Sequence, residues 1–295
     1  MEQWRLAVFL EEGGRLTEDR QGDAMPALQQ PLHTGTAPSA PAWPRVLLLV
    51  LAVGQVISSL ASQAAGTELT TPDRPGEPPI VPISWAFSIW GVIELLSLLY
   101  AVWALPDRRP DKRLRSELAV PLSIVFAGFS CWLVAAEVEP VWTTVVVFAV
   151  MVAGLLKALQ IALRSRAAIA KWPRPARWLI WWTIGIYSGW STMAIWINLT
   201  TSMAASGAPV SGTWGISGQL AVLAGATATA VVIVRWTNGL VPYTLAACWA
   251  LTTAALGAAD AGETLLAAAA AAGLCITAAT AVHARRHFRA PAPRP

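Results

Sequence analysis

The stretch PVWTTVVVFAVMVAGLLKALQIAL, residues 140–163, decides the fold class of this chain. Its only charged residue is Lys157, which lies close enough to one end of the stretch to snorkel to a membrane interface. A helix needs about 20 mostly apolar residues to cross the hydrocarbon core of a bilayer. The alternating pattern of a membrane strand is absent from the stretch. It therefore predicts a transmembrane helix.

Similar stretches lie on both sides of it, and together they predict an all-α, polytopic integral membrane bundle of about eight helices. The composition agrees, because 55% of the residues are apolar and only 13% are charged, against about 25% charged residues in soluble domains. The two stretches nearest the C-terminus are rich in alanine, which is only weakly apolar. The predicted spans are 45–66, 84–105, 116–136, 140–163, 177–201, 214–234, 239–259 and 263–284.

The regions outside the spans have a different composition. Residues 1–44 mix acidic side chains with proline, alanine, threonine and serine, which predicts a disordered tail. Residues 285–295 form a basic tail. Between the tails, residues 45–284 predict one transmembrane domain, whose one substantial outer loop, 67–83, is rich in proline.

Lysine and arginine gather in alternate loops. The segments 106–115 and 164–177 carry five each, and of the 21 basic residues in the chain only Arg74 lies in a predicted outer loop. This is the arrangement of the positive-inside rule, which places both termini in the cytoplasm. The net charge of +4 reflects this sidedness, so we expect the lipid bilayer, and no nucleic acid, as a partner.

The chain shows no arrangement of residues for metal or acid–base chemistry. Cys131, Cys248 and Cys275 fall in different predicted spans and share no metal-ligand spacing. No phosphate-binding loop, dinucleotide fingerprint or His/Asp/Glu cluster is present. We therefore expect no metal, no cofactor and no enzymatic activity.

Tryptophan is unusually abundant, with 16 Trp against 6 Phe and 3 Tyr. Ten of them, Trp132 and Trp196 included, fall near predicted span ends, where indole rings prefer to lie. Trp90, Trp190 and Trp249 lie deeper. Such indoles either pack between helices or line a pocket for a flat, apolar ligand.

Glu94 is the clearest polar anomaly, because it lies near the middle of the predicted span 84–105. An ionised side chain at that depth costs about 2.5–3.5 kcal/mol on insertion scales. We therefore expect Glu94 to face the interior of the bundle, as a protonated, hydrogen-bonded group or as a group that handles a ligand or a proton.

Small and polar residues mark the span 177–201. Gly185 and Gly189 form a pattern that lets helices approach closely, either within the chain or at a homodimer face. Asn198 shares a helix face with Trp190 and Ala194. We expect its side chain to form a hydrogen bond between helices.

Three segments carry a resemblance to a known family. The run from Trp85 to Gly91, the pattern Gly189-Trp190 with Ala194 and Asn198, and the run Leu240-Val241-Pro242-Tyr243 are spread over about residues 80–255. In these segments the chain resembles the tryptophan-rich sensory proteins, the longer bacterial relatives of the translocator protein (peripheral benzodiazepine receptor) family. The longer members usually have tyrosine where this chain has Glu94, and the short members have five helices.

The resemblance implies a receptor-like or transport-like protein of the bacterial inner membrane with a hydrophobic small-molecule ligand, for which a tetrapyrrole is one candidate. An alternative is a secondary transporter or permease component that uses Glu94 for coupling, although no inverted repeat is visible. An inert scaffold is a further alternative. The residues expected to bind the ligand are Trp85, Phe87, Trp90, Glu94, Trp190, Asn198, Pro242, Tyr243 and Trp249.

Overall fold

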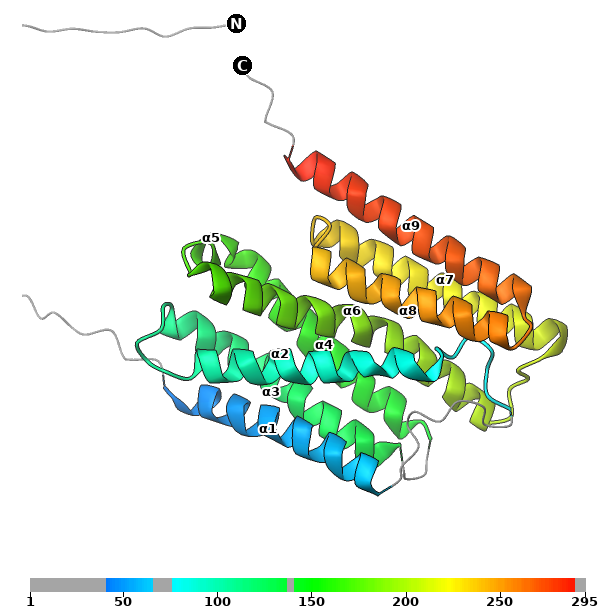
Figure 1. Cartoon of the computed structure of the whole chain (residues 1–295), viewed down its shortest axis with the longest axis horizontal. Coiled ribbons are helices and arrows are strands. Elements are labelled where there is room, and N and C mark those ends of the chain that lie inside the picture. The colour runs from blue at the N-terminus through cyan, green and yellow to red at the C-terminus, as the bar shows by residue number, and fades with distance from the viewer. Residues whose placement is uncertain (1–40, 66–75, 137–140, 290–295) are drawn as a thin grey trace, which may run out of the picture. The chain divides into compact units, whose positions relative to one another are not determined.

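The structure is a computed structural model that describes residues 41–65, 76–136 and 141–289, with side chains to residue 287 (Figure 1). Almost all of the predicted tail 1–44, part of the outer loop 67–83 and the end of the basic tail 285–295 lie outside the described residues.

Throughout the described residues the regular structure is helical and no strand is present, which confirms the all-α fold class. A 3-10 turn, η1, leads directly into α2, and the short α5 connects α4 to α6. The elements are α1 (Trp43–Ala64), η1 (Ser84–Ser88), α2 (Ile89–Ala104), α3 (Lys112–Ala135), α4 (Thr143–Arg164), α5 (Arg166–Ile169), α6 (Arg174–Ala205), α7 (Gly212–Trp236), α8 (Val241–Asp260) and α9 (Thr264–Arg289).

Seven of the described helices are long and apolar enough to cross a membrane, and they correspond to seven of the predicted spans. The remaining prediction, 177–201, is α6, whose tryptophan, serine, threonine and glycine residues lower its hydropathy. At 32 residues it is about 48 Å long, which exceeds the thickness of a bilayer core. It packs against α2, α4, α7 and α8, so it can carry more polar residues than a helix that faces lipid. With α6 included, the bundle has the expected eight long helices.

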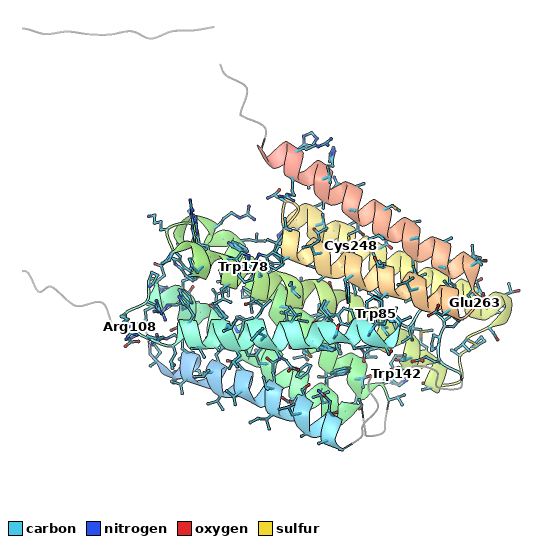
Figure 2. All side chains as sticks on the ribbon, viewed as in Figure 1. Trp85, Arg108, Trp142, Trp178, Cys248 and Glu263 are labelled. Carbon is cyan, nitrogen blue, oxygen red and sulfur yellow. The ribbon has the colours of Figure 1, made fainter. Side chains whose placement is uncertain are left out.

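The helices run alternately between two ends of the bundle. Arg108 and Trp178 lie at one end, and Trp142 and Glu263 lie at the other (Figure 2). We call the first end, with residues 105–115 and 164–177, the basic end.

We call residues 76–83, at the opposite end, the strap. They are the described part of the predicted outer loop, and the end of the bundle where they lie is called the strap end. The alternation of the helices brings both basic loop segments to one end, as the positive-inside pattern requires.

Close contact between α6 and α8 centres on two glycines. A Cβ atom on Gly185 would lie 2.7 Å from Cβ of Pro242, and one on Gly189 would lie 2.8 Å from Cβ of Ala246. Real Cβ atoms essentially never approach this closely. The small-residue pattern is therefore used for packing within the chain, and these two glycines are not available as an exposed homodimer face.

The loop at the basic end is held by two buried arginines. The Arg45 guanidinium donates hydrogen bonds to the Leu105 carbonyl (2.9 Å) and to the Asp107 carboxylate (2.6 Å). Arg115 donates to backbone carbonyls of the same turn, including that of Arg109 at 2.7 Å. Both guanidinium groups are inaccessible to solvent, so the loop carbonyls replace water as their partners.

We expect the pH dependence of stability to report on this loop. Hydrogen bonds from Arg45 and Lys112 hold the pKa of Asp107 below its ordinary value. A lowered folded-state pKa means that the stabilisation is present above the unfolded pKa of about 3.9 and is lost as the pH falls through the folded value. The thermal midpoint should therefore fall below about pH 4, and Asp107→Asn should lower it at neutral pH and weaken this acid dependence.

Scanning fluorimetry on the purified chain would measure both effects. Asp260→Asn, at the exposed end of α8, is the matched control and should keep the wild-type profile. Identical acid profiles for Asp107→Asn and the wild type would contradict the assignment. The effect is expected to be modest, because the Asp107 side chain is 63% exposed and solvent screens such pairs.

Candidate functional site

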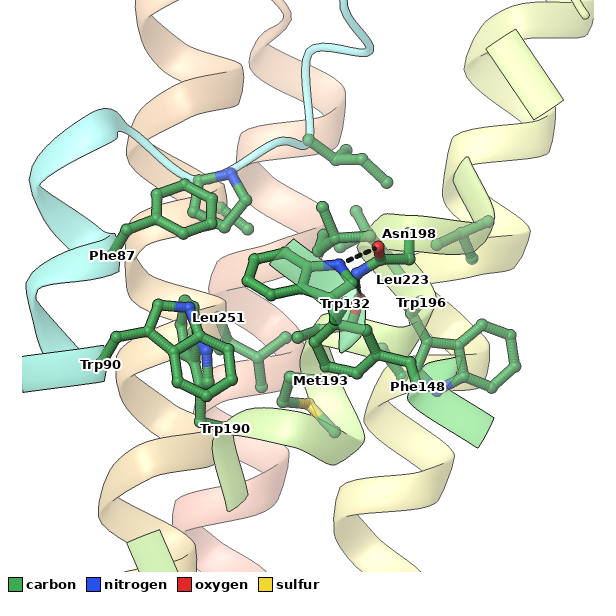
Figure 3. Close-up of a pocket in the computed structure, with 18 residues that line it drawn as sticks. Phe87, Trp90, Trp132, Phe148, Trp190, Met193, Trp196, Asn198, Leu223 and Leu251 are labelled. Atoms are coloured by element: carbon green, nitrogen blue, oxygen red, sulfur yellow. Dashed lines mark hydrogen bonds between the residues drawn. The ribbon is translucent and has the colours of Figure 1, made fainter. Parts of the chain in front are cut away.

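A pocket lies inside the bundle near the strap end. Six helices, η1 and the strap contribute to its wall, and nearly all of the lining is apolar (Figure 3). Helix α6 contributes more of the lining than any other helix, α7 and α8 contribute three residues each, and α2, α3 and α4 contribute one each. The lining residues are Ile80, Pro82, Phe87, Trp90, Trp132, Phe148, Trp190, Met193, Ala194, Trp196, Ile197, Asn198, Val222, Leu223, Ala226, Ala250, Leu251 and Ala254.

Trp90 is the hub of an aromatic cluster that forms much of the wall. Its ring centroid lies 5.6 Å from that of Trp132, 6.2 Å from that of Trp190 and 6.4 Å from that of Phe148. Phe87 packs edge-on against Trp190 at 5.8 Å. Edge-to-face and tilted pairs at these distances are favourable, each contributing about 0.5–1.5 kcal/mol beyond its buried area. The cluster therefore presents rigid aromatic faces and edges to the pocket.

The polar atoms of the pocket fall into two classes. The Trp132 indole N–H donates to Oδ1 of Asn198 (3.1 Å), and the Asn198 amide donates in turn to the Ala194 carbonyl (2.9 Å). By contrast, the indole nitrogens of Trp90 and Trp190 are buried and have no hydrogen-bond partner among the described residues. Both side chains line the pocket, so two hydrogen-bond donors of its wall are unused within the described part of the chain.

The strap covers the pocket and is fastened to α7 and α8. The Ile80 amide donates to Oε1 of Gln219 of α7 (3.2 Å), and the Ile83 amide donates to the Thr253 carbonyl of α8 (3.4 Å). Directly after the strap, the Trp249 indole of α8 donates to the Ala86 carbonyl of η1 (3.0 Å). At Gly257 a Cβ atom would collide with the Val81 carbonyl, so glycine is required for the strap to lie this close to α8.

Four of the nine predicted ligand residues line the pocket. Phe87 and Trp90 come from η1 and α2, and Trp190 and Asn198 come from α6. Asn198 forms the expected hydrogen bond between helices, to Trp132 of α3. These four side chains, far apart in the sequence, converge on one cavity.

The other predicted ligand residues lie outside this lining. Trp85 is half exposed and packs edge-on against Trp249 at 5.1 Å, so this pair fastens η1 to α8. Pro242 and Tyr243 form the α6–α8 contact, where the buried Tyr243 hydroxyl pairs with Thr192 at 2.9 Å.

Glu94 is buried, as expected, but it faces α1 and α6 rather than the pocket. Its carboxyl lies close enough to Ser59 of α1 and to Tyr187 of α6 to interact with both side chains. Trp90, one helical turn away on α2, lines the pocket, whereas Glu94 does not. A direct contact between Glu94 and a ligand in the pocket is therefore not supported.

Several lining residues were not predicted. Trp132 and Trp196 were assigned to the membrane interface because they lie near span ends, but Trp132 is 7% exposed and both line the pocket. A helical signal was present for Trp132, since Phe126 and Phe129 precede it at spacings that place all three on one side of α3. Phe148 and the alanines of α7 and α8 carry no such signal, because apolar residues occur on every face of a membrane helix.

The cavity is nearly closed in this structure. Its volume is about 40 Å³, against roughly 300–1,000 Å³ for typical sites of drug-sized ligands. A ligand larger than a few atoms must therefore separate the elements around it.

In the described part of the chain, no group of three or more His, Cys, Asp or Glu side chains is placed to hold a metal ion. The lining residues also include no titratable side chain. The chemistry that the pocket offers is apolar contact, aromatic stacking and hydrogen-bond donation.

Comparison with known proteins agrees with this architecture. Searches of curated proteins and of solved structures found no significant match. The family model described as TSPO-like protein matches residues 44–283, a range that covers every long helix from α1 to most of α9 and all three segments that carried the resemblance. The chain therefore belongs to the TSPO-like protein family and is a multi-pass membrane protein.

Proposed function

We propose that this protein binds a flat, mostly apolar small molecule with at least one hydrogen-bond acceptor in the pocket lined by Trp90 and Trp190. The observation that carries the proposal is the pair of buried, unpartnered indole N–H groups at an aromatic wall. An unsatisfied buried donor costs about 1–3 kcal/mol. A ligand acceptor would recover part of that cost, and the aromatic rings would contact the ligand's flat faces.

Tetrapyrroles combine the required properties, since they have a planar apolar body and peripheral or central acceptor atoms. The present cavity is too small for one, so binding must be accompanied by opening of the pocket. The strap is the element we expect to move, because it contributes Ile80 and Pro82 to the lining and is not part of a helix.

We infer a receptor-like or carrier-like role rather than catalysis, because the described lining lacks a nucleophile or a titratable group that could serve as acid or base. We further propose that the protein resides in a bacterial inner membrane with both termini in the cytoplasm. The gathering of basic residues at one end of the bundle supports this orientation.

A titration with protoporphyrin IX tests the binding proposal. Quenching of tryptophan emission would be followed with the purified full chain in detergent micelles. Trp190→Phe should weaken binding about tenfold, equivalent to about 1.4 kcal/mol, because the indole donor is lost while an aromatic ring remains. The fold should be largely unaffected by loss of the N–H group, since that group has no partner in the free protein.

Trp178→Phe is the matched control, because Trp178 is 51% exposed and stacks on Trp182 at the basic end. It should bind the porphyrin with wild-type affinity. The proposal fails if protoporphyrin IX, haem and a sterol all leave the emission unchanged up to about 100 μM, within the range of weak binding. Equal affinities of the two variants would show binding at a different site.

A further inference from the structure

A second group of buried polar side chains lies between α1, α2 and α6, outside the pocket. The Gln55 amide of α1 donates to the Tyr187 hydroxyl of α6 at 2.8 Å, and both side chains are inaccessible to solvent. Ser59, one turn further along α1, lies close enough to the Glu94 carboxyl of α2 to interact with it. The helices α1 and α2 run side by side along this contact (Figure 1).

Two oxygen atoms in this group are buried without a hydrogen-bond partner among the described residues. They are Oε1 of Gln55 and Oε1 of Glu94, and Glu94 as a whole is only 8% exposed. An amide oxygen and an ionised carboxylate are acceptors only, so neither can satisfy the other. A proton on Glu94 converts that side chain to a donor and removes a buried charge.

The polar group continues to the strap end of the bundle. Gln63, which is exposed at the end of α1, donates to the Ser59 hydroxyl at 3.5 Å. Ser59 therefore stands between an exposed amide and the Glu94 carboxyl. A series of hydroxyl and amide groups can connect a buried acid to water through hydrogen bonds.

In the other direction the group extends toward the basic end. Ser97 and Tyr100 lie about 4.5 and 9 Å beyond Glu94 along α2, and the hydroxyls of both are buried without a partner. Tyr100 in turn interacts electrostatically with Arg115. Buried hydroxyls normally have a protein or water partner, so this part of the bundle is polar well beyond Glu94.

The charged and titratable groups around Glu94 are few. Tyr187 faces it from α6, and α1 presents Gln55 and Ser59 at its level. On α1 and α3, Arg45 and Arg115 are bound to the loop at the basic end, and Glu117 of α3 is paired with Arg113. Protonation of Glu94 is therefore controlled by its burial and by its hydrogen bonds rather than by a neighbouring ion.

We propose that Glu94 is a reversible proton-binding site that exchanges with water at the strap end through Ser59 and Gln63. A hydronium ion at that end gives up its proton, the carboxylate becomes a carboxylic acid, and water remains; release is the reverse step. This function is independent of the apolar pocket and of any ligand in it. Trp90, which lines the pocket, lies one helical turn from Glu94 on α2.

Infrared spectroscopy of the full chain in lipid nanodiscs tests the proposal. A protonated, buried carboxyl gives a carbonyl band separate from that of carboxylates. The band should decrease reversibly between about pH 5 and about pH 9, a range that spans the titrations of exposed and buried carboxyls. It should be absent in Glu94→Gln. Among the described residues Glu94 is the only buried acidic side chain, which makes the assignment direct.

The proposed route is tested by transfer into D₂O, where the band shifts as the proton exchanges. Ser59→Ala should slow this shift about tenfold, because it removes the hydroxyl between Gln63 and Glu94. Ser130→Ala is the matched control, since Ser130 pairs with Ser58 across α1 and α3 at 2.9 Å and lies outside the group. This comparison does not require the Glu94→Gln variant to fold.

Three results would overturn the proposal: a wild-type spectrum without a protonated carboxyl band, a band that does not respond to pH, or equal exchange rates in Ser59→Ala and Ser130→Ala. Because no ligand is used, these outcomes leave the proposed binding function untouched. Conversely, failure of porphyrin binding would not alter the infrared result.

Discussion

Ala226→Leu should weaken binding of protoporphyrin IX at least about 100-fold, a loss of about 2.7 kcal/mol. Ala226 lies on α7, is 6% exposed and lines the pocket. The free volume is about 40 Å³, so an isobutyl group in place of a methyl group occupies most of it. The ligand would then have to displace a packed side chain as well as open the pocket.

The same substitution should have little effect on folding, because it fills space that is already present. Overpacking costs about 1–3 kcal/mol where no room exists, and the cavity reduces that cost. Titration of tryptophan quenching measures the affinity, and a thermal melt measures the stability. A variant that melts like the wild type but does not bind would locate the ligand in this pocket.

Ala224→Leu is the control on the same helix, since Ala224 is exposed on the outer surface of α7. It should bind with wild-type affinity. Ala254 lines the pocket from α8. Ala254→Leu should therefore weaken porphyrin binding as Ala226→Leu does. If Ala226→Leu and Ala254→Leu both bind as tightly as the wild type, the ligand does not enter this cavity.

The sequence was sufficient to predict the helices of this fold. Long apolar segments and alternating basic loops indicate both the number and the direction of spans. The exception is α6, whose composition is not apolar enough to identify it as a membrane span, although it packs against four other long helices. A helix surrounded by protein can replace lipid contacts with packed tryptophan, serine and glycine, as Gly185 and Gly189 do against α8. Hydropathy alone does not recognise such a helix.

The candidate site was predictable only in part. Depth along a helix correctly selected Trp90 and Trp190, but it misassigned Trp132, because position along the axis does not tell whether an indole points to lipid or to the interior. For Glu94, too, the sequence predicted the depth of the side chain but not its neighbours. Its burial followed from the cost of a charge in the membrane, whereas the α1 and α6 partners that it faces depend on how the helices pack.

Gly189→Ala should destabilise the protein by about 3 kcal/mol or more, the upper end of the range for overpacked cores. The added Cβ atom would lie 2.8 Å from Cβ of Ala246 and would also collide with the Tyr243 carbonyl oxygen. A backbone atom cannot turn away as a flexible side chain can, so α6 and α8 would have to separate. Trp190, the next residue, would move with α6, and the pocket would lose its geometry.

Gly218→Ala is the matched control, because nothing lies within 4 Å of a Cβ atom at that position of α7. It should be neutral or stabilising by up to about 1 kcal/mol, since alanine favours a helix more than glycine does. Thermal melts of both variants in the same detergent would give the comparison, and porphyrin titration would report on the pocket. If the two variants melt together, α6 and α8 do not approach as closely as Gly189 requires. The pocket wall around Trp190 would then not depend on this contact.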